Sequence, residues 1–324
     1  MTLPVDGYQL KDISPRAFEH PADRAATAAL ASIPGLDQVV RKLIELGYER
    51  ALRAAYLGSS VRLGPAQLPE TWNLHNQVFR TLDLDDVPEL YITQVPVANA
   101  NTIGAGRPIV VVNSELVRLL RVEERRAVLA HEAGHVLADH VLYFTALTIL
   151  LRMGNSVRLP IIAGLPLMAV RSALLEWSRA AELSCDRAAA LVTRDPEVVC
   201  RTLMVLAAGA EAEDLDLAQF MAQAHDYNSG GTGLERLSRM FIDLNITHPM
   251  PVRRAQELMA WVRSGEYDRI VGGEYVRRGD EAGVRAEAGD AAEHYANRFR
   301  NAFRDAGGAV GSATEQLADW LRKD

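Results

Sequence analysis

The segment that most constrains the fold is His131-Glu132-Ala133-Gly134-His135, which lies within a long stretch of helical apolar periodicity. We predict one continuous helix from about Glu123 to Leu151. Residues four apart on a helix share a face, so both imidazoles project together. Two neutral imidazoles at this spacing suit zinc, and the carboxylate of Glu132 can reach a metal-bound water.

The alternative for this segment is two solvated or hydrogen-bonded histidines on an ordinary helix. The residues around the motif argue against solvation, because 127–129 and 136–137 are all apolar. Buried imidazoles need partners, and a metal ion would provide one. We therefore favour a metal site.

A catalytic zinc site needs a third protein ligand and an open position. Glu182 is the best candidate, since it lies one turn from Asp186 in a helical segment with alanines on both sides. Such neighbours indicate burial, which is unfavourable for carboxylates without a cation. The alternative is an exposed acidic face with Arg179 and Arg187 as salt-bridge partners, and without the histidine motif that alternative would be preferred.

Other chemistry-bearing residues have weaker support. His140 lies about 140° round the predicted helix from His135, so we expect a hydrogen-bonded structural histidine. Cys185 has no basic partner in the sequence and is expected to be a small buried residue. His248, before Pro249, is by itself a loop histidine. The remaining histidines have no supporting context: His20, His75, His225 and His294.

The pattern predicts a mostly helical α+β fold with a small sheet of two to four strands beside the zinc-binding helix. Residues 90–92 and 109–112 form β-branched or aromatic runs. The turn-rich segment 99–106 could include a short edge strand, and Ser114 is a good helix N-cap. Further helices are expected within 12–58, broken at Pro34-Gly35, and at 70–82, 167–193, 196–209, 215–225, 233–243 and 251–264.

Three regions follow from these elements. Residues 1–88 are predicted to be a helical region packed on the catalytic domain, and residues 89–278 the catalytic core. Residues 279–324 carry apolar side chains at helical spacing, such as Tyr295, Phe299 and Phe303. This spacing predicts an amphipathic helical tail packed on the body of the protein. A regulatory or partner-binding tail is the alternative.

Composition narrows the function and its setting. The net charge of −7 gives no basic surplus for phosphate neutralisation, so no nucleic-acid partner is expected. The two cysteines require no oxidising compartment, and the N-terminus does not resemble a secretory signal.

The apolar runs Val141–Leu151 and Leu159–Val170 fall short of the ~20 residues of a spanning helix. We expect a buried helical hairpin in a soluble cytoplasmic protein, with peripheral membrane contact as the alternative, and the sequence predicts no particular oligomeric state.

Several blocks, in order, resemble the HtpX-like gluzincin zinc metallopeptidases, which include the type I CAAX prenyl proteases. Residues 128–135 resemble the family's zinc helix, and Ser178–Glu182 with Asp186 resembles its Glu-x-x-x-Asp block, with Cys185 where alanine is usual. Thr247-His248-Pro249 followed by Arg254 resembles the later His-Pro and Arg block. Asn99–Gly104 resembles the edge strand without its usual aromatic. The blocks cover about half of the chain.

The resemblance implies a gluzincin fold and a role for each matching residue. It implies one Zn²⁺ per chain, held by His131, His135 and Glu182. Glu132 would be the general base and His248 would hydrogen-bond the oxyanion. Asp186 would orient one of the two histidines, and Arg254 would brace the site against a carboxylate. The edge strand, residues Asn99, Ala100, Asn101 and Thr102, would pair with an extended peptide.

The sequence thus predicts a zinc metalloendopeptidase, a hydrolase that cleaves internal peptide bonds of a peptide, an unfolded protein or a membrane-associated protein. The first alternative is an inactive or weak pseudo-peptidase that binds a peptide or protein partner in the same pocket. An intact Glu132 argues against it. The second alternative, a coincidental motif, is disfavoured by the matching blocks around Glu182 and His248.

Overall fold

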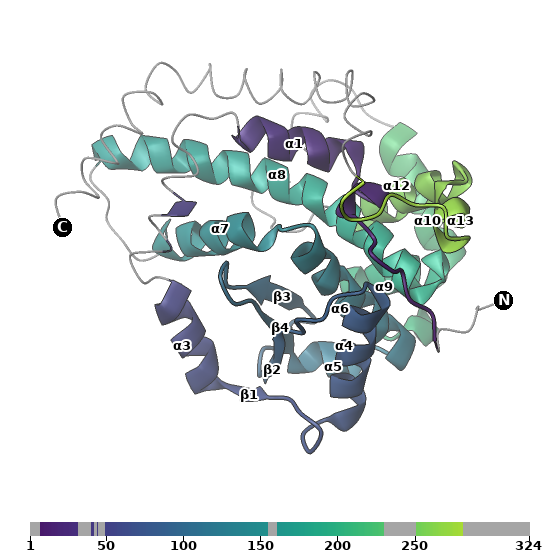
Figure 1. The fold of residues 1–324 in the computed structure, drawn as a ribbon, viewed down its shortest axis with the longest axis horizontal. Helices are drawn as coiled ribbons and strands as arrows, with labels where there is room; N and C mark the ends of the chain where they lie inside the picture. The colour runs from purple at the N-terminus through teal and green to yellow at the C-terminus, as the bar shows by residue number, and fades with distance from the viewer. Residues whose placement is uncertain are drawn as a thin grey trace.

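The computed structural model describes residues 7–31, 40–41, 44, 49–154, 161–229 and 251–280. Within these residues the protein is mostly helical, with one small mixed sheet (Figure 1). The helices are η1 (Pro15–Ala17), α1 (Pro21–Ala31), α3 (Glu49–Ser59), α4 (Pro69–Thr81), α5 (Ser114–Leu119), α6 (Val122–Leu137), α7 (Val141–Gly154), α8 (Ile161–Thr193), α9 (Pro196–Ala208), η3 (Ala212–Asp214), α10 (Leu217–Ser229), α12 (Pro251–Arg263) and α13 (Glu266–Val271).

The sheet has four strands in the order β1-β2-β4-β3. They are β1 (Ser60–Arg62), β2 (Glu89–Thr93), β3 (Ala100–Ile103) and β4 (Ile109–Asn113). β2 and β4 pair in parallel, whereas β1 and β3 run antiparallel to their neighbours. The edge strand predicted within 99–106 is therefore present as β3, and β1 was not predicted. Because β1 belongs to the predicted N-terminal region, the sheet crosses the boundary drawn at residue 88, and that boundary stays a prediction.

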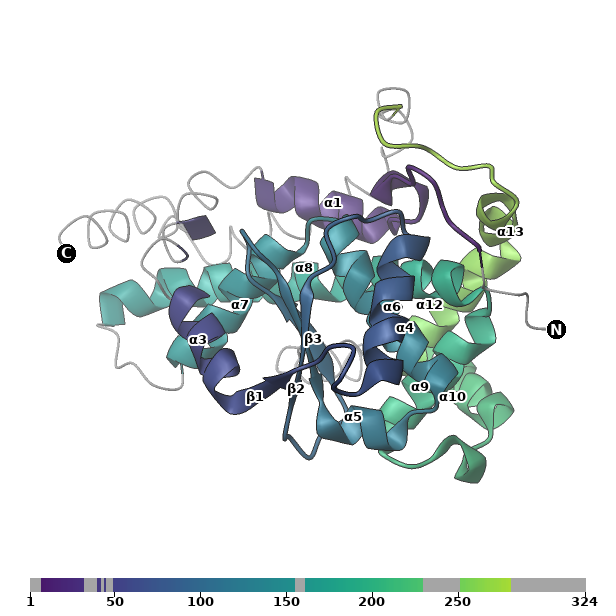
Figure 2. The ribbon, with the colours of Figure 1, turned by 60° about the horizontal axis from the view of Figure 1, so that its bottom comes forward.

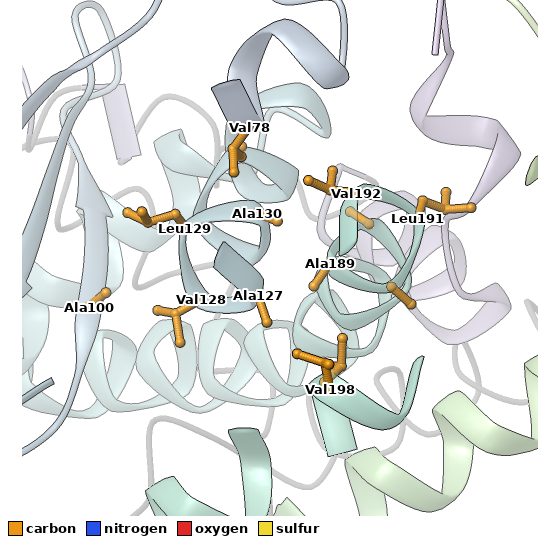
Figure 3. Packing of buried hydrophobic residues seen from close by; sticks show 14 of the residues in the cluster. Val78, Ala100, Ala127, Val128, Leu129, Ala130, Ala189, Leu191, Val192 and Val198 are labelled. Carbon is orange, nitrogen blue, oxygen red and sulfur yellow. The ribbon is translucent and has the colours of Figure 1, made fainter. Parts of the chain in front are cut away.

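The main core lies between the sheet and the long helix α8, with α6 in the middle (Figures 1 and 2). Figure 3 shows apolar side chains of α4, α6, α8, α9 and β3 converging around α6. The residues of α6 from Ala127 to His135 are all buried. The histidine motif therefore lies in the interior of the protein and not on a solvated helix face.

The predicted single helix from Glu123 to Leu151 is wrong. α6 ends at Leu137, and Asp139 adopts a left-handed conformation with φ of 56°. The amide N–H of His140 donates to the carbonyl of His135 at 3.0 Å, which closes the turn. Aspartate tolerates left-handed φ better than most residues. The chain turns by 104° and continues as α7, so His140 does not belong to the zinc helix.

A second apolar cluster joins α1, α7 and α8. It includes Leu30 of α1, Leu147 of α7 and Trp177 of α8. Every residue of Val141–Leu151 is buried or half-buried, which favours the buried-hairpin interpretation for this run. Among the described residues, no single helix has the length and apolar character needed to cross a membrane; α6 with part of α7 would reach them only as a bent pair.

Helix ends match the sequence signals in part. Asp195 caps α9, where its carboxylate accepts from the amides of Glu197 at 3.0 Å and Val198 at 3.2 Å. The N-cap of α5 is Asn113 and not the predicted Ser114, because β4 runs directly into the helix and leaves no separate capping residue. The helix predicted at 233–243 and the C-terminal helices beyond residue 280 lie outside the described residues.

The stability of this core should depend on pH through His75. The ring is buried on α4, its Nε2 lies 2.9 Å from the carbonyl oxygen of Pro88, and burial lowers its pKa from 6.5 to about 4. A buried imidazole that resists protonation in the folded state contributes its full stabilisation at pH values above its pKa in the unfolded state. This stabilisation is lost as the pH falls from about 6.5 to 4. The loss should reach about 3 kcal/mol.

Urea unfolding of the metal-free protein at pH 7 and pH 4 measures this loss. His75→Gln retains an amide donor for Pro88 but does not titrate, so it should lose less stability over the same interval. Equal losses in both proteins would exclude His75 as the source.

Candidate metal centre

The candidate metal centre lies where α6 crosses α8, and Gly134 permits the close approach of the two helices. A Cβ atom at this position would lie 2.9 Å from the Cβ of Ala188 and 3.3 Å from the Cα of Cys185. No real side chain fits at such distances without moving one of the helices. The glycine inside the histidine motif therefore lets α6 bring its two imidazoles against the carboxylates of α8.

Three side-chain donors converge at the crossing. The Nε2 atoms of His131 and His135 are 3.2 Å apart. Each lies 3.4 Å from a different oxygen of Glu182. Tetrahedral zinc with bonds of about 2.0–2.1 Å separates its ligand atoms by roughly 3.4 Å. The donors thus have the chemistry and the spacing that one zinc ion requires.

A second combination of donors replaces Glu182 with Cys185. One atom from each of His131, His135 and Cys185 lies within 4.8 Å of the others. The sulfur of Cys185, however, contacts the Nδ1 atom of His135 at 3.2 Å, whereas the two histidines face each other through Nε2. Burial, followed by the charge of Glu182, raises the pKa of the Cys185 thiol well above its usual value. The sulfur lies on the Nδ1 side of His135, away from the Nε2 atoms that face each other, so the set with Glu182 fits better.

A buried ion-pair network surrounds these donors. Asp186 accepts from Arg254 through both oxygens, at 2.5 and 2.7 Å, and Arg254 also contacts Glu182 at 2.9 Å. The Nδ1 atom of His131 lies 3.1 Å from Asp186. A carboxylate in this position fixes the tautomer that leaves Nε2 free for a metal. α12 thus contributes a cation that offsets two buried carboxylates.

The electrostatics of the two imidazoles differ. Burial alone would lower the pKa of His131, but the charge of Glu182 and the hydrogen bond to Asp186 raise it to about 9. Burial, together with the neighbouring imidazoles of His131 and His140, lowers the pKa of His135 to about 3, although the contact with Glu182 opposes the change. For Asp186, burial would raise the pKa, but the guanidinium of Arg254 lowers it below the usual range.

Glu132 is held at the side of the site that faces the sheet. It is buried on α6, and the hydroxyl of Thr102 on β3 donates to its Oε2 atom at 2.7 Å. The contact was not predicted, since Thr102 entered only as part of the edge strand. It ties the carboxylate to a fixed position next to the two histidines.

Two cavities adjoin Glu132 and Glu182. The larger, about 320 Å³, is lined by apolar residues of α5, α6 and α9, among them Leu116, Val128 and Leu203. The smaller, about 280 Å³, is lined by Phe144, Leu147 and Leu151 of α7. Asn99 and Ala100, where β3 begins, line both cavities, and the rest of β3 lines the smaller one.

The structure brings nearly all of the predicted site residues together. The residues that border the crossing of α6 and α8 are His131, Glu132, His135, Glu182, Asp186, Arg254 and the segment Asn99–Thr102. His248 lies outside the described residues. The proposed exposed acidic face is wrong, because Glu182 and Asp186 are buried, Arg179 pairs with Glu176, and Arg187 contacts backbone carbonyls.

Comparisons with known proteins agree with this site. The sequence profile of peptidase family M48 matches residues 65–262. The chain is 36% identical over 266 residues to the plastoglobule-localized metallopeptidase 48, chloroplastic, of Arabidopsis thaliana, a match that covers 81% of this chain and 76% of the relative. No solved structure matched. The chain belongs to peptidase family M48, a family of metallopeptidases that hydrolyse peptide bonds.

Proposed function

We propose that this protein is a zinc-dependent endopeptidase whose metal is held by His131, His135 and Glu182. The observation that carries the proposal is the convergence of donor atoms: the two Nε2 atoms are 3.2 Å apart, and each lies 3.4 Å from a different oxygen of Glu182. These distances match one tetrahedral ion and leave its fourth position for water or substrate.

Bound zinc would supply a Lewis acid that lowers the pKa of a coordinated water to about 7 and polarises the scissile carbonyl. Glu132 is the general base, since its buried carboxylate accepts a proton at the site and can return it to the leaving amine. Thr102 holds Glu132 in place. His248 is proposed to donate a hydrogen bond to the oxyanion, as the family's His-Pro block implies.

The substrate is proposed to be an extended peptide or unfolded protein segment that adds to β3. Among the described strands β3 is an edge, because β4 is its one neighbour in the sheet. An added strand would place alternate side chains on the same face, and apolar cavities lie on both sides of Glu132. Apolar residues are therefore expected on both sides of the cleaved bond.

The setting is also a proposal. The relative's name places that protein at plastoglobules in the chloroplast, and a peripheral contact of this chain with a membrane or lipid surface would agree with it.

A pseudo-peptidase that binds a peptide in the same cavities is the alternative function. Glu132, held by Thr102 beside the ligands, favours catalysis, since binding alone needs no base there.

Cleavage of an unfolded protein such as casein, with the products mapped by mass spectrometry, tests the proposal. We expect turnover that a zinc chelator abolishes and added zinc restores, with internal cuts flanked by leucine, valine or phenylalanine. Binding of casein without any cleavage by the zinc-loaded protein would instead support the pseudo-peptidase.

A further inference from the structure

A buried polar network on the far side of His135 is not explained by the proposed ligand set. It runs from the metal centre to the N-terminal helix α1, which lies beside α8 (Figure 1). Its members are His135 of α6, His140 in the turn before α7, Asp23 of α1 and Ser184 of α8, of which His140, Asp23 and Ser184 are at most 3% exposed. Polar groups buried so completely must satisfy one another.

We propose that Asp23 is a positioning residue of the metal centre, which fixes His140 and, through it, the zinc ligand His135. The proposal rests on the ligand set given above. The Nδ1 atoms of His135 and His140 are 3.1 Å apart, and the Nε2 atom of His140 lies 3.0 Å from the Oδ2 atom of Asp23. The three side chains thus form an uninterrupted series of hydrogen bonds.

The positions of the protons follow from the metal. A zinc ion at Nε2 of His135 requires the ring proton on Nδ1, where it needs an acceptor. The nearest acceptors are the imidazole nitrogen of His140 and the sulfur of Cys185 at 3.2 Å, and sulfur is the weaker acceptor. His140 therefore accepts through Nδ1, carries its own proton on Nε2 and donates it to Asp23.

Asp23 is placed to accept this hydrogen bond through its carboxylate. The hydroxyl of Ser184 donates to the same oxygen at 2.5 Å, and the hydroxyl of Thr27 lies 3.3 Å from the other oxygen. The indole N–H of Trp177 in turn donates to Thr27 at 2.8 Å. Donors from α1 and α8 thus hold the carboxylate in one orientation toward His140.

The two histidine ligands are consequently supported in different ways. His131 contacts the carboxylate of Asp186 directly, whereas His135 reaches a carboxylate through an intervening imidazole. Asp23 lies outside residues 65–262, the part that matches the family profile. The N-terminal helix therefore completes the metal centre of this chain instead of merely covering it.

Zinc dissociation constants, measured by competition with a chromophoric chelator, test this role. Asp23→Asn and His140→Phe should each weaken zinc binding by about 10- to 100-fold, the usual effect of removing such a partner. Because the two residues act in series, the double variant should bind zinc no more weakly than His140→Phe alone. His140→Phe keeps a ring of similar shape, so it serves if Asp23→Asn does not fold.

The matched control is Leu30→Ala on the same helix. Leu30 of α1 is fully buried in the apolar cluster with α7 and α8, so its truncation opens a cavity there without removing a hydrogen bond of the series. It should bind zinc as tightly as the wild type.

Nitrogen NMR of the zinc-loaded wild type should show His135 protonated on Nδ1 and His140 on Nε2.

Three outcomes would overturn the inference while leaving the zinc site intact: folded Asp23→Asn or His140→Phe with unchanged zinc affinity, additive effects in the double variant, or an equal loss in Leu30→Ala. Absence of zinc binding by the wild type would instead overturn the proposed function itself.

Discussion

Glu132→Gln is expected to retain zinc and fold while its turnover falls by about 10²–10⁴-fold, the usual effect of losing a general base. The amide has the shape of the carboxylate and can still accept from the hydroxyl of Thr102, which lies 2.7 Å from Oε2. It cannot accept a proton, so binding and hydrolysis should separate. Steady-state cleavage of a peptide identified from the casein digest, with the metal content of each sample determined, measures the effect.

Thr102→Val is the control for this experiment. It removes the hydroxyl that holds Glu132 but leaves the base, so its turnover should fall much less than that of Glu132→Gln. Chelator-sensitive turnover of Glu132→Gln at the wild-type rate would remove Glu132 from its proposed role.

Arg254→Met should destabilise the metal-free protein by about 3–5 kcal/mol, the usual cost of removing one partner of a buried ion pair. The guanidinium lies within 2.5–2.9 Å of oxygens of Asp186 and Glu182, and all three side chains are buried. Methionine fills much of the same space but leaves two carboxylates without their cation. Zinc should recover part of the loss, because a ligand that binds the folded state stabilises it.

Urea unfolding with a chelator and with saturating zinc measures both effects. Arg118→Met provides the comparison, because Arg118 pairs with Glu115 on the exposed surface and its removal should change stability little. Equal stabilities of Arg254→Met and the wild type in the presence of chelator would show that the buried carboxylates do not need this cation.

The sequence predicts the local parts of the site well because their signals are local. The histidine spacing and the alanine-rich neighbours of Glu182 indicate one helix face each, and both helices are present. The apolar run at 109–112 predicts β4, which is buried on both faces of the sheet. Asp195 before Pro196 marks the start of α9 through capping chemistry that acts within four residues.

The long-range parts could not be predicted in the same way. The turn at Asp139 interrupts an apolar pattern that continues into α7, so periodicity alone extends the helix too far. Asp23 lies more than a hundred residues from His140 in the sequence, and no spacing rule connects them. The hydroxyl of Thr102 also reaches Glu132 only through the packing of β3 on α6.

Zinc content of the purified wild type, Glu182→Ala and Cys185→Ala, measured side by side, tests the central claim most directly. The two variants distinguish the two possible donor sets at the crossing of α6 and α8. We expect one zinc per chain in the wild type and in Cys185→Ala, and a sharp loss in Glu182→Ala. Loss of zinc in Cys185→Ala with full retention in Glu182→Ala would contradict the ligand set on which the proposed endopeptidase depends.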